Sequence, residues 1–140
     1  MITGLAHNAF RVTDMDKALA FYCGVLGFSK AFEIPDDAGN PWIVYIKVAH
    51  EQFIELFYGA DCGRPASEGT PPGFCHFCLA VDDAKAEYER IRALWPVKTP
   101  LQMGKDTNWQ FWVTDPDGND IEFMQLTPTS PQYRCCHPEE

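Results

Sequence analysis

The sequence predicts an α+β fold built from two β-α-β-β-β modules, and three observations support this. Apolar residues alternate at strand or helix spacing in the same order in both halves of the chain. A Gly- and Pro-rich stretch separates the halves. Three landmarks also recur at offsets of 67 to 69 positions: the helix caps Asp14 and Asp82, the histidines His7 and His76, and the glutamates Glu55 and Glu122.

The first module is predicted to span residues 2–59. A helix over 14–25 follows from the cap signal Thr13-Asp14 and from apolar residues at helical spacing, which Gly24 and Gly27 then end. Four segments have strand character. One precedes this helix, 5–12, and three follow it: 28–34, 42–48 and 52–58.

Residues 60–73 are interpreted as the linker, and the second module is predicted over 74–127. Its helix begins at Asp82-Asp83 and runs to about Leu94, before Pro96. The predicted strands of this module are 74–81, 97–101, 109–114 and 120–126. The two modules together form one domain over 1–127, and residues 128–140 form a tail without periodicity.

Composition excludes several classes of function. The net charge of −9 disfavours nucleic acid and anionic membrane surfaces as partners, because both attract a basic face. No apolar run approaches the length of a membrane span, and the first ten residues lack a signal-peptide pattern. The six Cys are interpreted as free thiols. We therefore expect a cytosolic protein that acts on a small molecule.

Glu55 and Glu122 each place one carboxylate inside a short apolar strand, where an uncompensated charge is costly to bury. Taken singly, such a Glu commonly faces solvent, and a strand His such as His7 or His76 is commonly a hydrogen-bonded, partly buried residue. The shared offset favours treating the four residues as one set. Two imidazoles and two carboxylates suit an octahedral divalent first-row metal ion with two positions left for water or substrate.

Strand alternation then predicts which residues share a face with these four ligands. The set is largely apolar, as expected for a small-molecule cavity: Leu5, Ala9, Arg11, Phe53, Phe57, Phe74, Cys78, Ala80, Asp120 and Met124. Arg11 either binds a substrate carboxylate or reaches solvent from the strand end. We predict substrate contacts from Arg11, Phe57, Phe74 and Met124.

The chain resembles a known family, the vicinal oxygen chelate superfamily, and within it the glyoxalase I-like (lactoylglutathione lyase-like) branch. The resemblance extends to about residue 126 and is carried by these stretches: His7 with Arg11, 18–28, 53–57, His76 followed by 81–83, and 115–122. The Phe-Tyr…Leu-Gly-Phe and Asp-Pro-Asp-Gly signatures within them are specific for the superfamily and less specific for the reaction.

The resemblance implies that the two modules form an open, barrel-like sheet around one divalent metal ion (Ni, Co, Mn, Fe or Zn), usually in a homodimer. It assigns His7, Glu55, His76 and Glu122 as metal ligands. Glu122 takes the position of the catalytic base, and Glu55 faces it. The implied reaction converts the hemithioacetal of a 2-oxoaldehyde and glutathione to the 2-hydroxyacyl thioester by proton transfer through an enediolate.

Three alternatives stay open. Gly59 stands where glyoxalase I enzymes have an Asn that contacts glutathione, which leaves room for an epimerase or isomerase acting on another substrate with vicinal oxygens. An extradiol-type ring-cleaving dioxygenase needs more open metal positions than four protein ligands leave, so Glu55 argues against it. A metal-free small-molecule-binding resistance protein would lack the ligands, whereas this chain has all four.

Overall fold

The computed structural model describes residues 5–59, 74 and 76–137. The chain divides into two compact units, Met1–Pro71 and Pro72–Glu140, and each is described here by itself. The predicted linker over 60–73 and the residues Cys62 and Cys75 lie outside the described residues.

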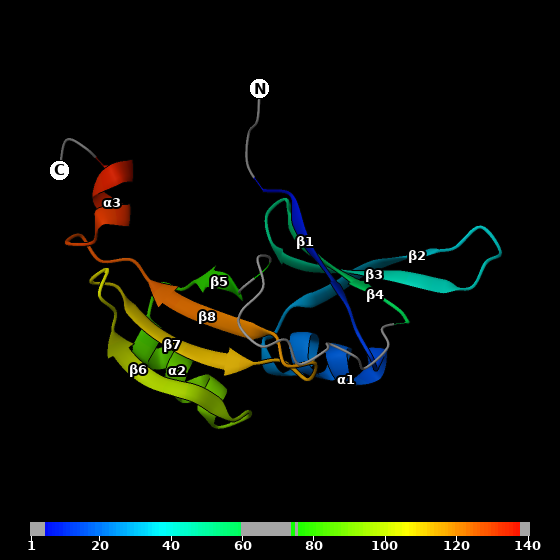
Figure 1. The fold of residues 1–140 in the computed structure, drawn as a ribbon, viewed down its shortest axis with the longest axis horizontal. Helices are drawn as coiled ribbons and strands as arrows, with labels where there is room; N and C mark the ends of the chain where they lie inside the picture. The colour runs from blue at the N-terminus through cyan, green and yellow to red at the C-terminus, as the bar shows by residue number, and fades with distance from the viewer. Residues whose placement is uncertain (1–4, 60–73, 75, 138–140) are drawn as a thin grey trace, which may run out of the picture. The chain divides into compact units, whose positions relative to one another are not determined.

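The first unit is a four-stranded mixed sheet in the order β1-β4-β3-β2 (Figure 1). β1 runs parallel to its neighbour β4, whereas the β2–β3 and β3–β4 pairs are antiparallel. The elements are β1 (His7–Arg11), the α-helix α1 (Met15–Leu19), the π-helix η1 (Ala20–Val25), β2 (Ser29–Pro35), β3 (Pro41–Ala49) and β4 (Gln52–Phe57).

The helical segment of this unit starts as predicted. Asp14 is the N-cap, and its side chain accepts a hydrogen bond of 3.0 Å from the backbone N–H of Lys17. The helix then widens into a π-helix, in which the N–H of Leu26 donates to the carbonyl of Phe21 at 3.0 Å. Gly27, at φ +78°, ends the segment, a conformation that glycine adopts without steric cost.

The second unit repeats the topology, with its sheet in the order β5-β8-β7-β6 and β5 parallel to β8. Its helix α2 contacts β6, β7 and β8. The elements are β5 (His76–Ala80), α2 (Ala84–Arg92), β6 (Val97–Met103), β7 (Trp109–Thr114), β8 (Asp120–Gln125) and α3 (Pro131–Cys136). The repeated β-α-β-β-β order is thereby confirmed. No helix in the described part of the chain is long and apolar enough to cross a membrane.

The N-cap of α2 is Asp83 rather than the predicted Asp82, and its side chain accepts from the N–H of Ala86 at 2.9 Å. Asp14 and Asp83 are separated by the same number of positions as His7 and His76. The internal repeat is therefore more regular in the structure than the sequence pattern indicated.

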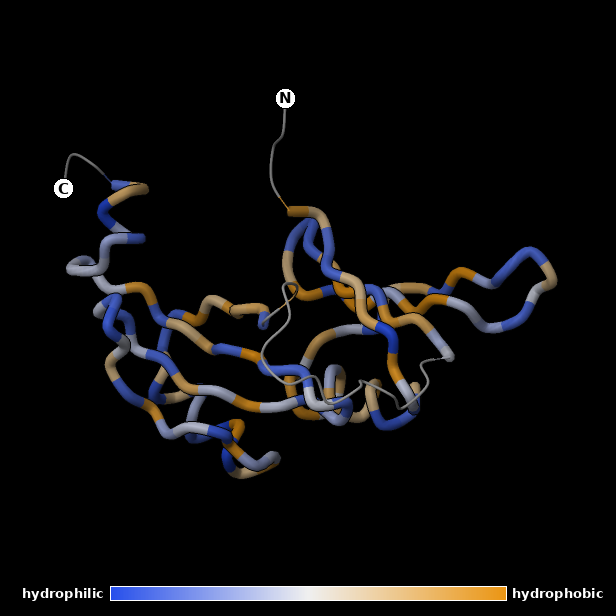
Figure 2. The backbone as a smooth tube through the Cα atoms, in the orientation of Figure 1, coloured by the Kyte–Doolittle hydropathy of each residue, from blue (hydrophilic) through white to orange (hydrophobic). Residues whose placement is uncertain are grey.

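One face of each sheet packs into a core. In the first unit Val44, Ile46, Ile54 and Leu56 are fully or almost fully buried, and they alternate with residues of the opposite face. Figure 2 shows this alternation as changes of colour along the strands, and it shows a mostly hydrophilic tip on the β2–β3 hairpin. The odd-numbered strand residues around Glu55 therefore belong to the other face.

In the second unit the core centres on stacked rings. Phe111 of β7 and Phe123 of β8 lie parallel, with centroids 4.6 Å apart and an interplanar angle of 8°. Tyr88 of α2 meets Phe111 edge-on at 5.4 Å. These contacts fix the helix against the face of the sheet that lies opposite Glu122.

The segment after β8 contains a short helix, α3, where the sequence pattern predicted none. Ser130 is its buried N-cap and accepts from the N–H of Tyr133 at 3.1 Å, and Pro131 stands in the first turn. Thr127 ties the segment to the β6–β7 loop, since its hydroxyl donates to the carbonyl of Thr107 at 2.6 Å. A helix of this length is too short to produce a detectable apolar period, so its local signals are the cap Ser130 and Pro131.

Two turns in the chain share one hydrogen-bond pattern. In the β7–β8 turn, Asp115 Oδ1 accepts from the N–H groups of Asp117 and Asn119 at 2.9 and 2.8 Å, and Oδ2 accepts from Asn119 Nδ2 at 2.9 Å. In the β2–β3 turn, Asp36 accepts the corresponding bonds from Asn40 at 2.7 and 3.2 Å. Asp115 and Asn119 are buried, whereas the Asp36 bonds are exposed to water.

We expect Asp115→Ala to lower the free energy of unfolding by about 3 kcal/mol, because it leaves buried N–H donors without partners. The matched variant Asp36→Ala should cost clearly less, since water can replace the lost carboxylate. Urea denaturation of both variants measures the difference. Equal losses in the two variants would contradict the role assigned to burial.

Candidate functional site

The first unit brings His7 and Glu55 together. Because β1 pairs in parallel with β4, Ala9 lies opposite Glu55 and His7 lies two positions back along the same face. His7 Nε2 is 3.5 Å from Glu55 Oε1. The carboxylate is buried while the imidazole is about half exposed. Solvent therefore reaches the pair on the side of the imidazole.

Tyr45 completes this first group. It lies opposite Glu55 in the β3–β4 register, and its hydroxyl donates a hydrogen bond to Glu55 Oε1. This hydrogen bond, together with burial, raises the pKa of the Tyr45 phenol above its ordinary value. The ring stacks on Phe32 with centroids 4.4 Å apart and meets Phe53 edge-on at 6.2 Å. Tyr45 is therefore held by aromatic contacts while its hydroxyl holds the carboxylate.

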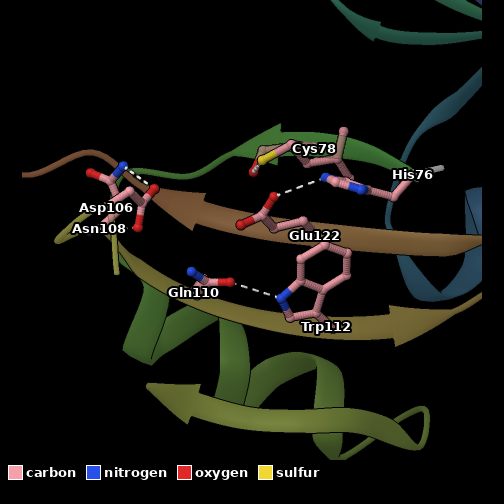
Figure 3. Close-up of polar contacts among 8 residues, drawn as sticks. His76, Cys78, Asp106, Asn108, Gln110, Trp112 and Glu122 are labelled. Carbon is pink, nitrogen blue, oxygen red and sulfur yellow. Dashed lines mark hydrogen bonds and ion pairs between the residues drawn. The ribbon is translucent and has the colours of Figure 1, made fainter. Parts of the chain in front are cut away.

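The second unit presents the equivalent pair. His76 Nε2 lies 3.3 Å from Glu122 Oε2, and both side chains project from the same face of the β5–β8 pair (Figure 3). Glu122 is buried, as Glu55 is. Sequence repetition predicted that the two His and the two Glu are equivalent, and within each unit the structure gives them the same arrangement.

Cys78 occupies the position next to Glu122 that Ala9 occupies next to Glu55. Figure 3 shows its thiol on the same side of the sheet as the carboxylate. Partial desolvation, together with the charge and hydrogen bonding of Glu122, raises the pKa of the Cys78 thiol to about 12. The thiol is therefore a protonated, weak donor beside Glu122 rather than a thiolate.

Trp112 occupies the position opposite Glu122 on β7, equivalent to that of Tyr45. Its ring meets His76 edge-on with centroids 4.6 Å apart. Its Nε1 donates to Gln110 Oε1 at 2.9 Å, so the indole N–H is directed to an amide and not to the carboxylate (Figure 3).

The donors in each pair fit a divalent metal ion. Two ligand atoms bound at about 2.1 Å and at right angles would be about 3 Å apart, close to the observed separations of 3.3 and 3.5 Å. Both separations join an imidazole Nε2 to a carboxylate oxygen, the donor types that such ions accept. Within the described residues of either unit, no three His, Cys, Asp or Glu side chains form a metal-binding group, and each unit by itself brings one His–Glu pair of donors.

The predicted substrate contacts have different surroundings. Arg11 lies opposite Phe57 in the β1–β4 register, with its guanidinium carbon 5.8 Å from the centre of that ring. Met124 lies on β8 two positions beyond Glu122 and is buried. Phe74 is exposed and precedes β5, which begins at His76, so the strand alternation that placed it on the ligand face does not extend to it.

Tyr45 is the site residue that the sequence reasoning missed. A signal for it existed, because the β3–β4 hairpin turns around His50 and a symmetric hairpin places Tyr45 opposite Glu55. The second hairpin places Trp112 opposite Glu122 in the same way.

Comparisons with known proteins agree with this fold. The chain is 32% identical to a lactoylglutathione lyase of Pseudomonas putida over 87% of this chain and 84% of that protein. It is also 32% identical to a probable lactoylglutathione lyase of Synechocystis over 88% of this chain and 95% of that one.

A solved structure shares the fold. The crystal structure of a lactoylglutathione lyase from Agrobacterium tumefaciens superposes with a TM-score of 0.66 at 26% identity, covering 89% of this chain and 94% of that chain. This match confirms the predicted fold class. Residues 4–123 match the profile of the family described as "Glyoxalase/Bleomycin resistance protein/Dioxygenase superfamily". The chain is therefore a member of this superfamily.

Proposed function

We propose that this protein is a metal-dependent lyase of the glyoxalase I type. Its substrate would be the hemithioacetal of a 2-oxoaldehyde and glutathione, and its product the 2-hydroxyacyl thioester. The observation that carries the proposal is the duplicated His–Glu pair, with separations of 3.5 and 3.3 Å on equivalent strands. The relatives named lactoylglutathione lyase support the choice of reaction within the superfamily.

In this proposal one divalent ion (Ni, Co, Mn, Fe or Zn) is held by His7, Glu55, His76 and Glu122 together. Two carboxylates would balance the charge of the ion, which accounts for two buried glutamates without a Lys or Arg partner in the described contacts. When bound, such an ion supplies Lewis-acid stabilisation of charge that develops on the substrate oxygens.

The chain's own residues would carry the proton. Glu122 takes the proton from the carbon that bears the hydroxyl group and the sulfur, and it returns that proton to the neighbouring carbonyl carbon. The carboxylate of Glu122 suits this task because its nearest side-chain partners are His76 and Cys78. Neither holds the carboxylate in place with a strong hydrogen bond. Arg11 would bind a carboxylate of the glutathione part, with apolar contacts from Phe57, Phe74 and Met124.

A second candidate is an isomerase or epimerase acting on another substrate with vicinal oxygens. Gly59, at φ +84° just after β4, stands where glyoxalase I enzymes have an amide side chain, and it can make no such contact. We also propose that the protein acts in the cytosol, as its composition suggests, and as a homodimer, as the resemblance to its superfamily implies.

Metal loading combined with one assay tests the proposal. The purified protein is stripped with a chelator, reloaded separately with Ni²⁺, Co²⁺, Mn²⁺ or Zn²⁺, and assayed with methylglyoxal plus glutathione. We expect about one ion per chain and turnover with at least one metal. Protein that takes up none of these ions would overturn the proposal, and protein that binds metal without any turnover would move the assignment to the isomerases.

A further inference from the structure

We propose that Tyr45 positions Glu55, so that Glu55 acts as a fixed ligand and proton transfer falls to Glu122. The inference concerns a residue outside the four ligands and rests on the proposed function. It starts from a difference between two otherwise equivalent pairs. The carboxylate of Glu55 accepts a hydrogen bond from a phenol, whereas Glu122 has a thiol beside it.

The contacts of Glu55 leave it little freedom. Its Oε1 accepts from the Tyr45 hydroxyl and faces His7 Nε2, while Oε2 has no partner among the described side chains. Tyr45 cannot easily turn away, because Phe32 stacks on one face of its ring and Phe53 abuts it edge-on. One oxygen is thus restrained and the other is left for a ligand.

Glu122 lacks this restraint. The residue opposite it, Trp112, donates its only side-chain N–H to Gln110. Its described neighbours are His76, the counterpart of His7, and Cys78, and a thiol is a much weaker donor than a phenol. A carboxylate that must accept and return a proton has to change its position or its hydrogen bonding, so the less restrained of the two is the better suited.

Partners that orient metal ligands typically change metal affinity by about 10- to 100-fold when they are removed. We therefore expect Tyr45→Phe to weaken metal binding about tenfold, measured by competition with a chromogenic chelator. At saturating metal we expect kcat to fall while KM stays close to that of the wild type, since the ligand set is then less well oriented but the substrate contacts are intact.

Two matched variants complete the experiment. Cys78→Ala removes the donor beside Glu122 and creates the residue type found at the equivalent Ala9, so we expect its effect on metal affinity to be smaller than about threefold. Tyr88→Phe, in α2 against Phe111, makes the same chemical change far along the chain from Tyr45 and should leave metal affinity and turnover unchanged.

The outcomes separate this proposal from the proposed function. If the wild type binds metal and Tyr45→Phe binds it equally well, the positioning role is overturned while the lyase assignment stands. If the wild type binds no metal, the function itself fails. Thermal unfolding of the metal-free variants checks the fold. Should Tyr45→Phe not fold, Phe32→Leu, which keeps the phenol but removes its stacking partner, is expected to weaken metal binding by a smaller factor, and an unchanged affinity there overturns the proposal.

Discussion

Glu122→Gln is expected to lower kcat by about a hundredfold or more, because positioned general bases contribute about 10²- to 10⁴-fold. The amide has nearly the same size and retains an oxygen beside His76, so the fold should persist. It cannot accept the proton from the substrate carbon, and the chemical step is lost. Steady-state turnover of methylglyoxal plus glutathione, at saturating metal, measures the effect.

Glu55→Gln is the matched control for that substitution. If Glu55 is the restrained ligand, its amide variant should lose metal affinity more than Glu122→Gln does, and turnover should recover in part when metal is raised. A Glu122→Gln enzyme that turns over within about tenfold of the wild type would show that Glu122 is not the base.

His7→Ala is expected to weaken metal binding by more than about a hundredfold, since outer contacts of a metal site alone account for about 10- to 100-fold. The substitution removes one of the four proposed ligands and leaves Glu55 buried beside an empty space. Titration against a competing chelator, followed by elemental analysis after desalting, measures the loss. The same result is expected for His76→Ala, because the two pairs are equivalent.

His50→Ala provides the control for the histidine variants. His50 lies in the β3–β4 turn with its side chain almost fully exposed, and it belongs to neither pair. Its removal should leave metal binding unchanged. Metal retention by both His7→Ala and His76→Ala would contradict the proposed ligand set.

Local features of the sequence predicted most of the fold. Strand positions followed from alternation, and the strand over Trp109–Thr114 was predicted with the bounds that the structure has. The caps predicted both module helices, although the choice between Asp82 and Asp83 depended on which backbone adopts the extended cap conformation. The π-helix at Ala20–Val25 was not predictable, because a change in hydrogen-bond partner leaves the apolar spacing nearly unchanged.

The pairs themselves were only partly predictable. Repetition indicated that His7 and Glu55 belong together, but no turn connects β1 to β4, so nothing local sets their parallel register. Tyr45 differs in this respect, since a short hairpin joins its strand to that of Glu55 and sets which residues lie opposite each other. Trp112 donates to Gln110 and not to Glu122, and this depends on side-chain packing that a sequence pattern does not encode.

The parallel pairing of β1 with β4, and of β5 with β8, has a consequence for folding kinetics. In each unit the His comes from the first strand and the Glu from the last, so a helix and two strands separate the two donors along the chain. Closing such a long loop is slow compared with forming a hairpin. A chain emerging during synthesis therefore carries no His–Glu pair until the last strand of a module has been made.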